Sequence, residues 1–145
     1  MISNAYANKI LNLLCGVSDS LTLPTTLYLG LSGSAPNTST GAIPTTNGEP
    51  TAASYARTAV GGSSSSPKSF GSASAGVIKN SIEIQFKTAR EAWGKMNYFF
   101  LSDSATGAAI MWGEINNGNG VTISEETVPT FYENELKISL DMPLT

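Results

Sequence analysis

A short alternation of leucines constrains the fold more than any other feature of the chain. Leu27, Leu29 and Leu31 alternate with Tyr28 and Gly30. A two-residue period places the three leucines on one face of a β-strand. The strand is bounded by the proline at position 24 and by the Ser-Gly-Ser-Ala-Pro sequence of residues 32–36. A polar tract then leads to a second short strand predicted at residues 55–60, so residues 32–54 are predicted to form a surface loop on a β-sheet.

Alternation of the same kind returns in the second half of the chain. The side chains of Ile82, Ile84 and Phe86 are predicted to be buried, because polar residues separate them. Residues 96–101 predict a mostly buried strand, residues 103–107 a hairpin turn, and residues 108–115 a strand that pairs back. Asn117-Gly118 and Asn119-Gly120 both suit a tight turn before a strand at residues 121–123, and the register between them stays open. The last strand is predicted at residues 135–141, with inward side chains at Leu136, Ile138 and Leu140.

Two segments are predicted to be helical. Ser3 can cap a helix that runs to about Cys15 and ends at Gly16. Its apolar residues form a single stripe along the helix. The preferred interpretation is that this stripe packs on the chain's own sheet; the alternative is that it docks against a neighbouring subunit. Residues 88–93 predict a helical turn in a capping-box arrangement, with Thr88 as the cap and Glu91 at the third helical position.

Cys15 stands at the end of this apolar face and is predicted to be a buried small hydrophobic residue. A role as a nucleophile is disfavoured because the chain has no histidine to act as its base.

The predicted fold class is mainly β: an antiparallel β-sandwich with a short N-terminal helix and long surface loops. About seven short strands are expected, without the strand–helix alternation of a parallel α/β sheet. Residues 1–145 are predicted to form a single domain, with the helix in residues 1–16 and long loops at residues 32–54 and 61–76. The second loop has the Gly/Ser composition of a flexible connector. It is not a domain boundary, because too few strands precede it to close a core.

The chain carries little charge. Charged residues make up 13% of it, against about 25% in a typical soluble domain. The net charge of −3 and the scattered basic residues argue against a nucleic-acid partner. No apolar run reaches the ~20 residues needed to span a bilayer, and the N-terminus lacks the basic region of a signal peptide. We therefore expect synthesis in a cytoplasm and no membrane insertion, and the single cysteine fits such a reducing compartment.

Catalytic, cofactor and metal chemistry find little support in the sequence. Without histidine, acid–base work would fall to carboxylates, Lys, Tyr or the lone cysteine. Glu125 and Glu126 would point to opposite faces of a strand, whereas Glu133 and Glu135 form a solvated charge ladder with Lys137. Zinc sites favour Cys and His, the Asp103 region is explained by a turn, and no glycine-rich segment has the lysine of a P-loop. We expect no catalytic, cofactor-binding or metal-binding residues.

Aromatic residues cluster in the second half of the chain, at Trp93, Tyr98, Phe99, Phe100 and Trp112. Either Phe99 or Phe100 and at least one tryptophan are predicted to belong to the core. Any aromatic side chain that faces outward would be suited to a partner's pocket or to stacking on a sugar ring.

The order of these segments resembles a family of short tailed-bacteriophage virion proteins, commonly labelled tail-fibre proteins. The resemblance rests on the LTLPTTLYLGLSGSAPN sequence of residues 21–37, GEPTAASYAR at 48–57, NSIEIQF at 80–86, AWG at 92–94, DSATG at 103–107, and the final strand. It covers most of the chain. It implies a non-enzymatic structural protein of the virion, assembled in the host cytoplasm. Its partners would be other virion proteins and copies of itself, for which a trimer is one arrangement, and a host-surface receptor.

Two functions are compatible with this resemblance. The favoured one is a small oligomeric decoration or auxiliary protein on the head, because the chain lacks the heptads or repeating β-elements of a fibre shaft. The alternative is a tail-fibre or receptor-binding module whose long loops recognise a bacterial surface glycan or protein. A polysaccharide hydrolase is disfavoured, since no pair of facing carboxylates is evident. The candidate subunit interface consists of Tyr6, Ile10, Leu13, Leu14, Pro36, Pro44 and Tyr55.

Overall fold

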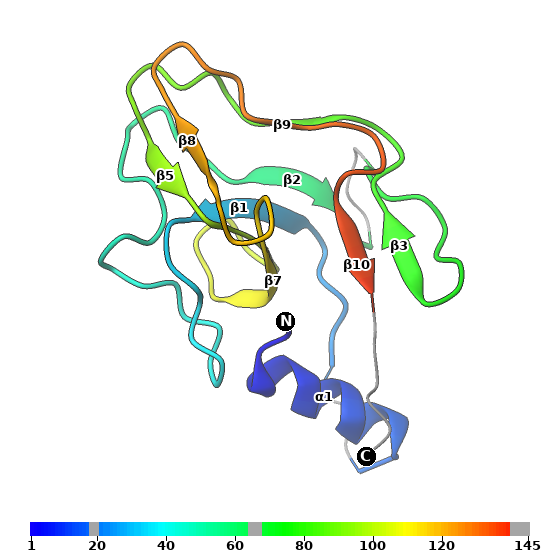
Figure 1. Ribbon diagram of the computed structural model, residues 1–145. Coiled ribbons are helices and arrows are strands. Elements are labelled where there is room, and N and C mark those ends of the chain that lie inside the picture. The colour runs from blue at the N-terminus through cyan, green and yellow to red at the C-terminus, as the bar shows by residue number, and fades with distance from the viewer. Residues whose placement is uncertain (18–20, 64–67, 140–145) are drawn as a thin grey trace.

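The computed structural model describes residues 1–17, 21–63 and 68–139, and it is a mostly β structure with one N-terminal helix (Figure 1). Several antiparallel sheets lie in a sandwich-like arrangement, which confirms the predicted fold class. The elements are α1 (Asn4–Leu14), β1 (Leu27–Ser32), β2 (Thr58–Gly61), β3 (Val77–Lys79), β4 (Ile84–Gln85), β5 (Gly94–Met96), β6 (Tyr98–Ser102), β7 (Ala109–Glu114), β8 (Val121–Ile123), β9 (Thr130–Phe131) and β10 (Lys137–Ser139).

One layer is a four-stranded antiparallel sheet with the order β2-β1-β6-β7. The leucine alternation of β1 is confirmed: Leu29 and Leu31 are buried, and Leu27 is half-buried. The predicted second strand begins later than expected, at Thr58, because the N–H of Tyr55 donates to Ala52 O (3.0 Å) in a turn and pairing with β1 begins only at Thr58, opposite Leu29. The predicted hairpin turn at residues 103–107 connects β6 to β7, as expected.

The other layer is a long two-stranded ribbon in three paired sections: β5 with β8, β4 with β9, and β3 with β10. Figure 1 shows this ribbon arching over the sheet, with β5–β8 at one end and β3–β10 at the other. Between the sections the N–H of Ala89 donates to Thr127 O (2.8 Å) and the N–H of Trp93 donates to Ile123 O (3.0 Å). The predicted helical turn at residues 88–93 is therefore wrong, because its backbone groups are bonded across the ribbon.

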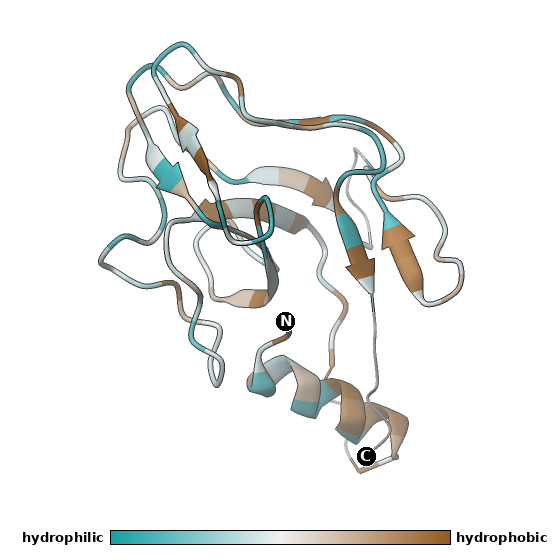
Figure 2. Ribbon diagram, viewed as in Figure 1, coloured by the Kyte–Doolittle hydropathy of each residue, from teal (hydrophilic) through white to brown (hydrophobic). Residues whose placement is uncertain are grey.

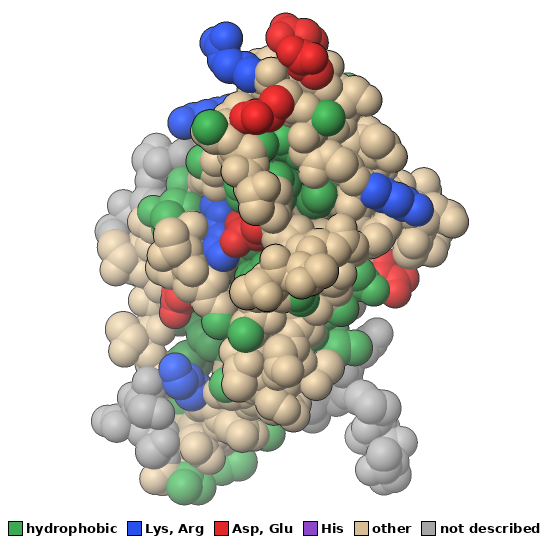
Figure 3. Space-filling view, turned by 90° about the vertical axis from the view of Figure 1, so that its left-hand side faces the viewer, with side chains coloured by type: hydrophobic (Ala, Val, Ile, Leu, Met, Phe, Trp, Pro, Cys, Tyr) green, Lys and Arg blue, Asp and Glu red, His purple; other side chains and the backbone are tan. Residues whose placement is uncertain are grey.

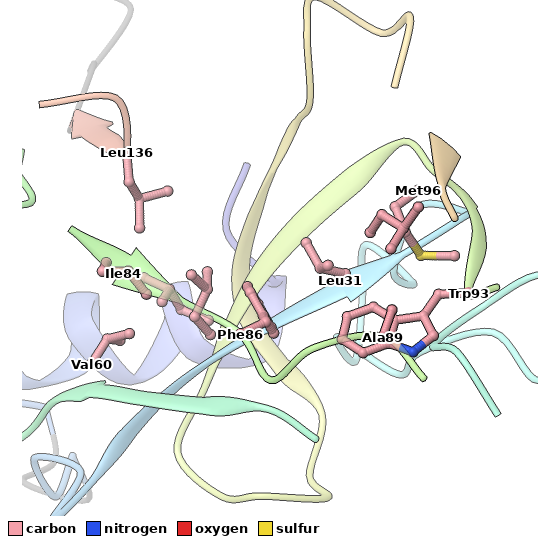
Figure 4. Close-up of a cluster of buried hydrophobic side chains, with 11 residues drawn as sticks. Leu31, Val60, Ile84, Phe86, Ala89, Trp93, Met96 and Leu136 are labelled. Atoms are coloured by element: carbon pink, nitrogen blue, oxygen red, sulfur yellow. The ribbon is translucent and has the colours of Figure 1, made fainter. Parts of the chain in front are cut away.

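The main core lies between the two layers (Figure 4). The sheet contributes Leu29, Leu31, Val60 and Leu101, and the ribbon contributes Ile84, Phe86, Ala89, Trp93, Met96, Ile123 and Leu136. Ile82 was expected to be buried with Ile84 and Phe86 but is exposed. Ile82 precedes β4, whose pairing with β9 begins only at Ile84. The alternation of buried and exposed side chains therefore does not extend back to Ile82. Burying each of the large apolar side chains contributes about 1.5–3 kcal/mol.

A smaller cluster covers the outer face of the sheet. Phe100, Ala109 and Trp112 are buried there, with Ile43 and Tyr98 packed against them. The prediction for the aromatic residues is confirmed, since Phe100, Trp93 and Trp112 are core residues. Phe100 lies directly across from Gly30 in the sheet. A Cβ atom at Gly30 would overlap the Phe100 ring, so this position needs glycine for a close approach.

The buried side chain of Asn80 joins the two strands of the ribbon near β3 and β10. Its side chain is fully buried, and Nδ2 donates to Ile82 O (2.9 Å) and Tyr132 O (2.8 Å), while Oδ1 accepts the N–H of Leu136 (2.9 Å). Leu136 is buried and Ile138 half-buried, as predicted. The predicted inward residue Leu140 and the end of that strand lie outside the described residues. So do residues 64–67 of the loop predicted at 61–76.

Candidate interaction surface

Helix α1 begins and ends as the sequence predicts. Its N-cap is Ser3, whose backbone oxygen accepts the N–H of Ala7 (2.9 Å) and whose side chain accepts that of Tyr6 (3.4 Å). The chain leaves the helix through Gly16 at a φ of +69°, a left-handed conformation that favours glycine.

The N-terminal end of α1 is fastened to the domain. The N–H of Asn4 donates to Thr38 O (2.9 Å) and that of Ala5 to Ser39 O (3.0 Å), both in the first long loop, and the N–H of Ser3 donates to Ile110 O (2.9 Å) of β7. We find no comparable backbone attachment from the C-terminal half of α1 to the described parts of the sheet or ribbon.

The apolar stripe of α1 is only partly covered. No residue of the helix is fully buried. Tyr6 and Ile10 are half-buried and line an apolar groove of about 430 Å³ against Leu27 and Leu101 of the sheet. Leu13 and Leu14, one turn further on, are exposed. Packing on the chain's own sheet thus accounts for the first half of the stripe, whereas Leu13 and Leu14 in the second half do not line this groove and remain exposed.

Exposed apolar side chains gather at the C-terminal end of α1 and in the segment that follows it. We call this surface the apolar pole; its members and exposed fractions are Leu11 (54%), Leu13 (43%), Leu14 (76%), Val17 (73%) and Leu23 (70%). Figure 2 shows the hydrophobic colour concentrated on this half of the helix. Large apolar surfaces of this kind mark interaction sites in soluble proteins.

Cys15 lies at this pole and is exposed, so its predicted burial is wrong. It is the C-cap residue of α1, beyond the part of the helix that faces the groove.

The first long loop is fastened to the sheet by a buried ion pair. The Arg57 side chain is 2% exposed, and its Nε and Nη2 donate to the two carboxylate oxygens of Glu49 at 2.9 and 2.6 Å. Its Nη1 donates to Ser102 Oγ (3.0 Å) and to the carbonyl oxygens of Ser104 (3.0 Å) and Gly107 (2.8 Å). The guanidinium also stacks on the Phe100 ring, 4.7 Å from its centroid. Residues 33–57 and the β6–β7 turn are therefore locked together.

Tyr55 extends this network into the core. Its hydroxyl donates to Glu49 Oε1 (2.7 Å) and accepts the N–H of Leu31 (3.0 Å). Burial raises the pKa of the Tyr55 hydroxyl well above its ordinary value of 10.0, and the negative charge of Glu49 raises it further. Sequence analysis missed this network. The one available signal was a pair of opposite charges, Glu49 in the predicted loop and Arg57 in the predicted second strand, in a chain with few charged residues.

The predicted interface residues fall into two groups. Pro36 is buried, Pro44 is half-buried and Tyr55 is held in the Arg57 network, so these three contact their own chain. Leu13 and Leu14 belong to the apolar pole, with Tyr6 and Ile10 in the adjoining groove.

The opposite end of the molecule is polar. Figure 3 shows acidic and basic side chains gathered at the end formed by the ribbon, away from α1. The exposed charged residues of this ribbon end are Lys87, Arg90, Glu91, Lys95, Glu125 and Glu126. Within residues 1–17, 21–63 and 68–139, no group of three or more His, Cys, Asp or Glu side chains could hold a metal ion. In the same residues, no helix has the length and hydrophobicity to cross a membrane.

The β-rich fold, the locked first loop and the exposed apolar pole are together typical of a structural protein. The chain belongs to the family described as Gp80, podophage GP4 fiber I protein gp80, whose model matches residues 1–139. It is therefore a structural protein of the phage virion, as the order of its sequence segments indicated. No match was found among curated proteins.

Proposed function

We propose that this protein is a non-enzymatic subunit of a phage tail fibre, assembled onto the virion in the host cytoplasm. Its attachment surface is the apolar pole, which binds other virion proteins or copies of the same chain, with a trimer as one arrangement. The observation that carries this proposal is the exposure of Leu13 and Leu14 on a helix whose backbone bonds to the described sheet and loops all come from its other end. The fibre family to which the chain belongs supports the location.

The proposal assigns different roles to the two ends of the domain. The apolar pole faces the particle, and the polar ribbon end and the first long loop face outward. Because the Arg57–Glu49 pair locks this loop to the sheet, the loop presents a preorganised surface, which lowers the entropic cost of binding. A glycan or protein of the host surface is the partner proposed for this outer end.

Decoration of the phage head is the second candidate. The observation that favours it is the absence of heptads or repeated β-elements from the sequence, since a fibre shaft is built from such repeats. In this role the same apolar pole would contact the head lattice, so the location on the particle separates the two candidates.

The test is incorporation of a Leu14→Lys variant into phage particles. Lysine at the last turn of a helix suits the helix dipole, so the isolated protein should keep its stability within about 0.5 kcal/mol. The copies per particle should fall about tenfold, which corresponds to about 1.4 kcal/mol of lost contact. Val121→Lys is the matched control, because Val121 is 46% exposed but belongs to the ribbon.

Cryo-electron microscopy of wild-type particles locates the protein. Density at the tail fibre supports the proposal, and regular density on the head supports the second candidate. Equal incorporation of the Leu14→Lys and Val121→Lys variants would contradict the role of the apolar pole in either location.

A further inference from the structure

Strand β10 has a second edge that carries no strand in the part of the chain that the structure describes. On its first edge it pairs with β3, with Ile138 opposite Ile78. The N–H of Asn80 donates to Leu136 O (3.1 Å), so these two residues form a hydrogen-bonded pair. Such pairs alternate with non-hydrogen-bonded pairs in an antiparallel ladder. Ile78 and Ile138 are then the next hydrogen-bonded pair, and Lys137 and Ser139 direct their backbone N–H and C=O groups away from β3.

The other edge of β3 confirms this assignment. The N–H of Gly71 donates to Lys79 O (3.0 Å), and Val77 exchanges two backbone bonds with Ser74 (2.9 and 3.0 Å). Lys79 and Val77 are the residues opposite Lys137 and Ser139, and they too direct their backbone groups out of the pair. The structure shows no backbone partner for the outward groups of β10 among residues 1–17, 21–63 and 68–139.

This free edge forms one wall of a groove of about 390 Å³. Side chains of β6 and β7 line it as well, among them Phe99 and Met111, which are apolar and only half-buried. The ribbon has two strands where the sheet beneath it has four, so the groove lies where the upper layer lacks a further strand.

The far rim of the groove is the N-terminal segment, which forms an isolated antiparallel bridge with β7 between Ile2 and Met111. Met1 and Ile2 line this rim. The N–H of Trp112 donates to Met1 O (2.8 Å) and the N–H of Ser3 donates to Ile110 O (2.9 Å). Because these bonds flank Ile2, its own N–H and C=O groups point away from β7.

Two properties of the groove specify what it can bind. Unpaired backbone donors and acceptors along an edge are a template for an extended chain, and apolar side chains beneath the edge select apolar residues at alternate positions. Among the described residues that line the groove, the charged groups are the Lys137 side chain and the N-terminal ammonium of Met1, which donates to Trp112 O (2.6 Å), and both are positive. Charge complementarity therefore favours a segment with an acidic side chain on its outer face.

We propose that this groove binds an extended segment of a partner protein, which adds to β10 as a further strand. Apolar side chains of the segment would cover Phe99 and Met111, and an acidic side chain would face Lys137. This site is separate from the apolar pole, so it does not depend on the proposed function.

The probe is a synthetic six-residue peptide with blocked ends, in which valine alternates with threonine and one threonine is replaced by glutamate. Binding to the full-length protein is followed by isothermal titration calorimetry and by hydrogen exchange. We expect saturable binding at peptide concentrations up to about 1 mM, with slower exchange of the Lys137 and Ser139 amides.

Ser139→Pro is the decisive variant. Proline removes the outward N–H of residue 139, which β3 does not use, and it is tolerated at a strand edge. Binding should weaken at least about tenfold, whereas Ser139→Ala, which keeps the N–H, should bind normally. Lys137→Glu should favour the same peptide with lysine in place of its glutamate.

Three results would overturn the proposal. One is the absence of peptide binding to the wild-type protein, and another is equal binding by the proline and alanine variants. The third is self-association of the wild-type protein that Ser139→Pro abolishes, because the occupant would then be a second copy of this chain. None of these results bears on the Leu14→Lys experiment, which tests the apolar pole.

Discussion

Removal of the Glu49 carboxylate should destabilise the domain more than any surface substitution. In the Glu49→Ala variant the Arg57 guanidinium stays between Phe100 and the β6–β7 turn, where its side chain is 2% exposed. Two charge-assisted hydrogen bonds disappear, and the hydroxyl of Tyr55 loses its acceptor. The cation is then buried without a counter-charge, which is the costly arrangement for an ion pair.

The magnitude follows from the burial of the two partners. Breaking a buried pair by removing one partner costs about 3–5 kcal/mol. Since the Glu49 side chain is 24% exposed, water can reach part of the vacated space, and we expect the lower end, about 3 kcal/mol. For a domain of this size each kcal/mol lowers the melting temperature by roughly 2–4 °C, so the expected loss is about 6–12 °C.

Urea unfolding followed by tryptophan fluorescence measures this loss at low and high salt. A buried pair is weakly screened, so the difference from wild type should persist in about 1 M NaCl. The control is Glu91→Ala, which removes an exposed carboxylate of the ribbon end and should change stability by less than about 0.5 kcal/mol. A Glu49→Ala loss as small as that of the control would refute the buried network.

A double variant distinguishes an unpaired charge from simple loss of packing. When Arg57→Met is added to Glu49→Ala, the uncompensated cation is gone, and the double variant should be more stable than Glu49→Ala alone. If it is less stable, the cost comes from packing and from the other Arg57 contacts instead.

Three further substitutions test other parts of the structure. Because burial raises the pKa of Tyr55 above 10.0, the folded state holds its proton more tightly than the unfolded state. The Tyr55 proton therefore contributes fully to the free energy of unfolding below about pH 10, and this contribution decreases above pH 10 by up to about 1.4 kcal/mol per pH unit. Urea midpoints measured from about pH 8 to 11 should show this decrease in the wild type and not in Tyr55→Phe. Gly30→Ala should cost about 1–3 kcal/mol in thermal unfolding, since its Cβ would overlap Phe100, whereas Gly71→Ala, with 3.5 Å to its nearest neighbour, should be nearly neutral. Asn80→Ala should cost about 3 kcal/mol in urea unfolding and speed amide exchange in β10, because it leaves buried backbone groups unpaired.

Local patterns in the sequence were sufficient for the elements that local chemistry decides. The Ser3 cap and Gly16 terminate α1 where expected, because capping depends on residues within one turn. The leucine alternation of β1 and the turn after β6 are also where the sequence indicates. In each case the determining groups are neighbours in the chain.

The ribbon required the tertiary structure. Its two strands come from residues 77–96 and 121–139, and Ala89 meets Thr127 across it. Thr88 and Glu91 match the pattern of a capping box, so local propensity favours a helical turn at residues 88–93. The structure has no such turn, because the backbone groups of this segment bond across the ribbon instead. The exposure of Ile82 could not be predicted from local pattern either, since it depends on β4 beginning to pair only at Ile84.

The candidate interaction surfaces were also predicted only in part from the sequence. The sequence by itself determined an N-terminal helix with an apolar stripe and its placement in a family of phage fibre proteins. Only the tertiary structure decided that Tyr6 and Ile10 face the sheet while Leu14 and Cys15 face solvent, because that depends on which end of α1 the loop and β7 hold. The free edge of β10 is likewise a property of the assembled layers, since a strand has an open edge only in relation to the strands placed beside it.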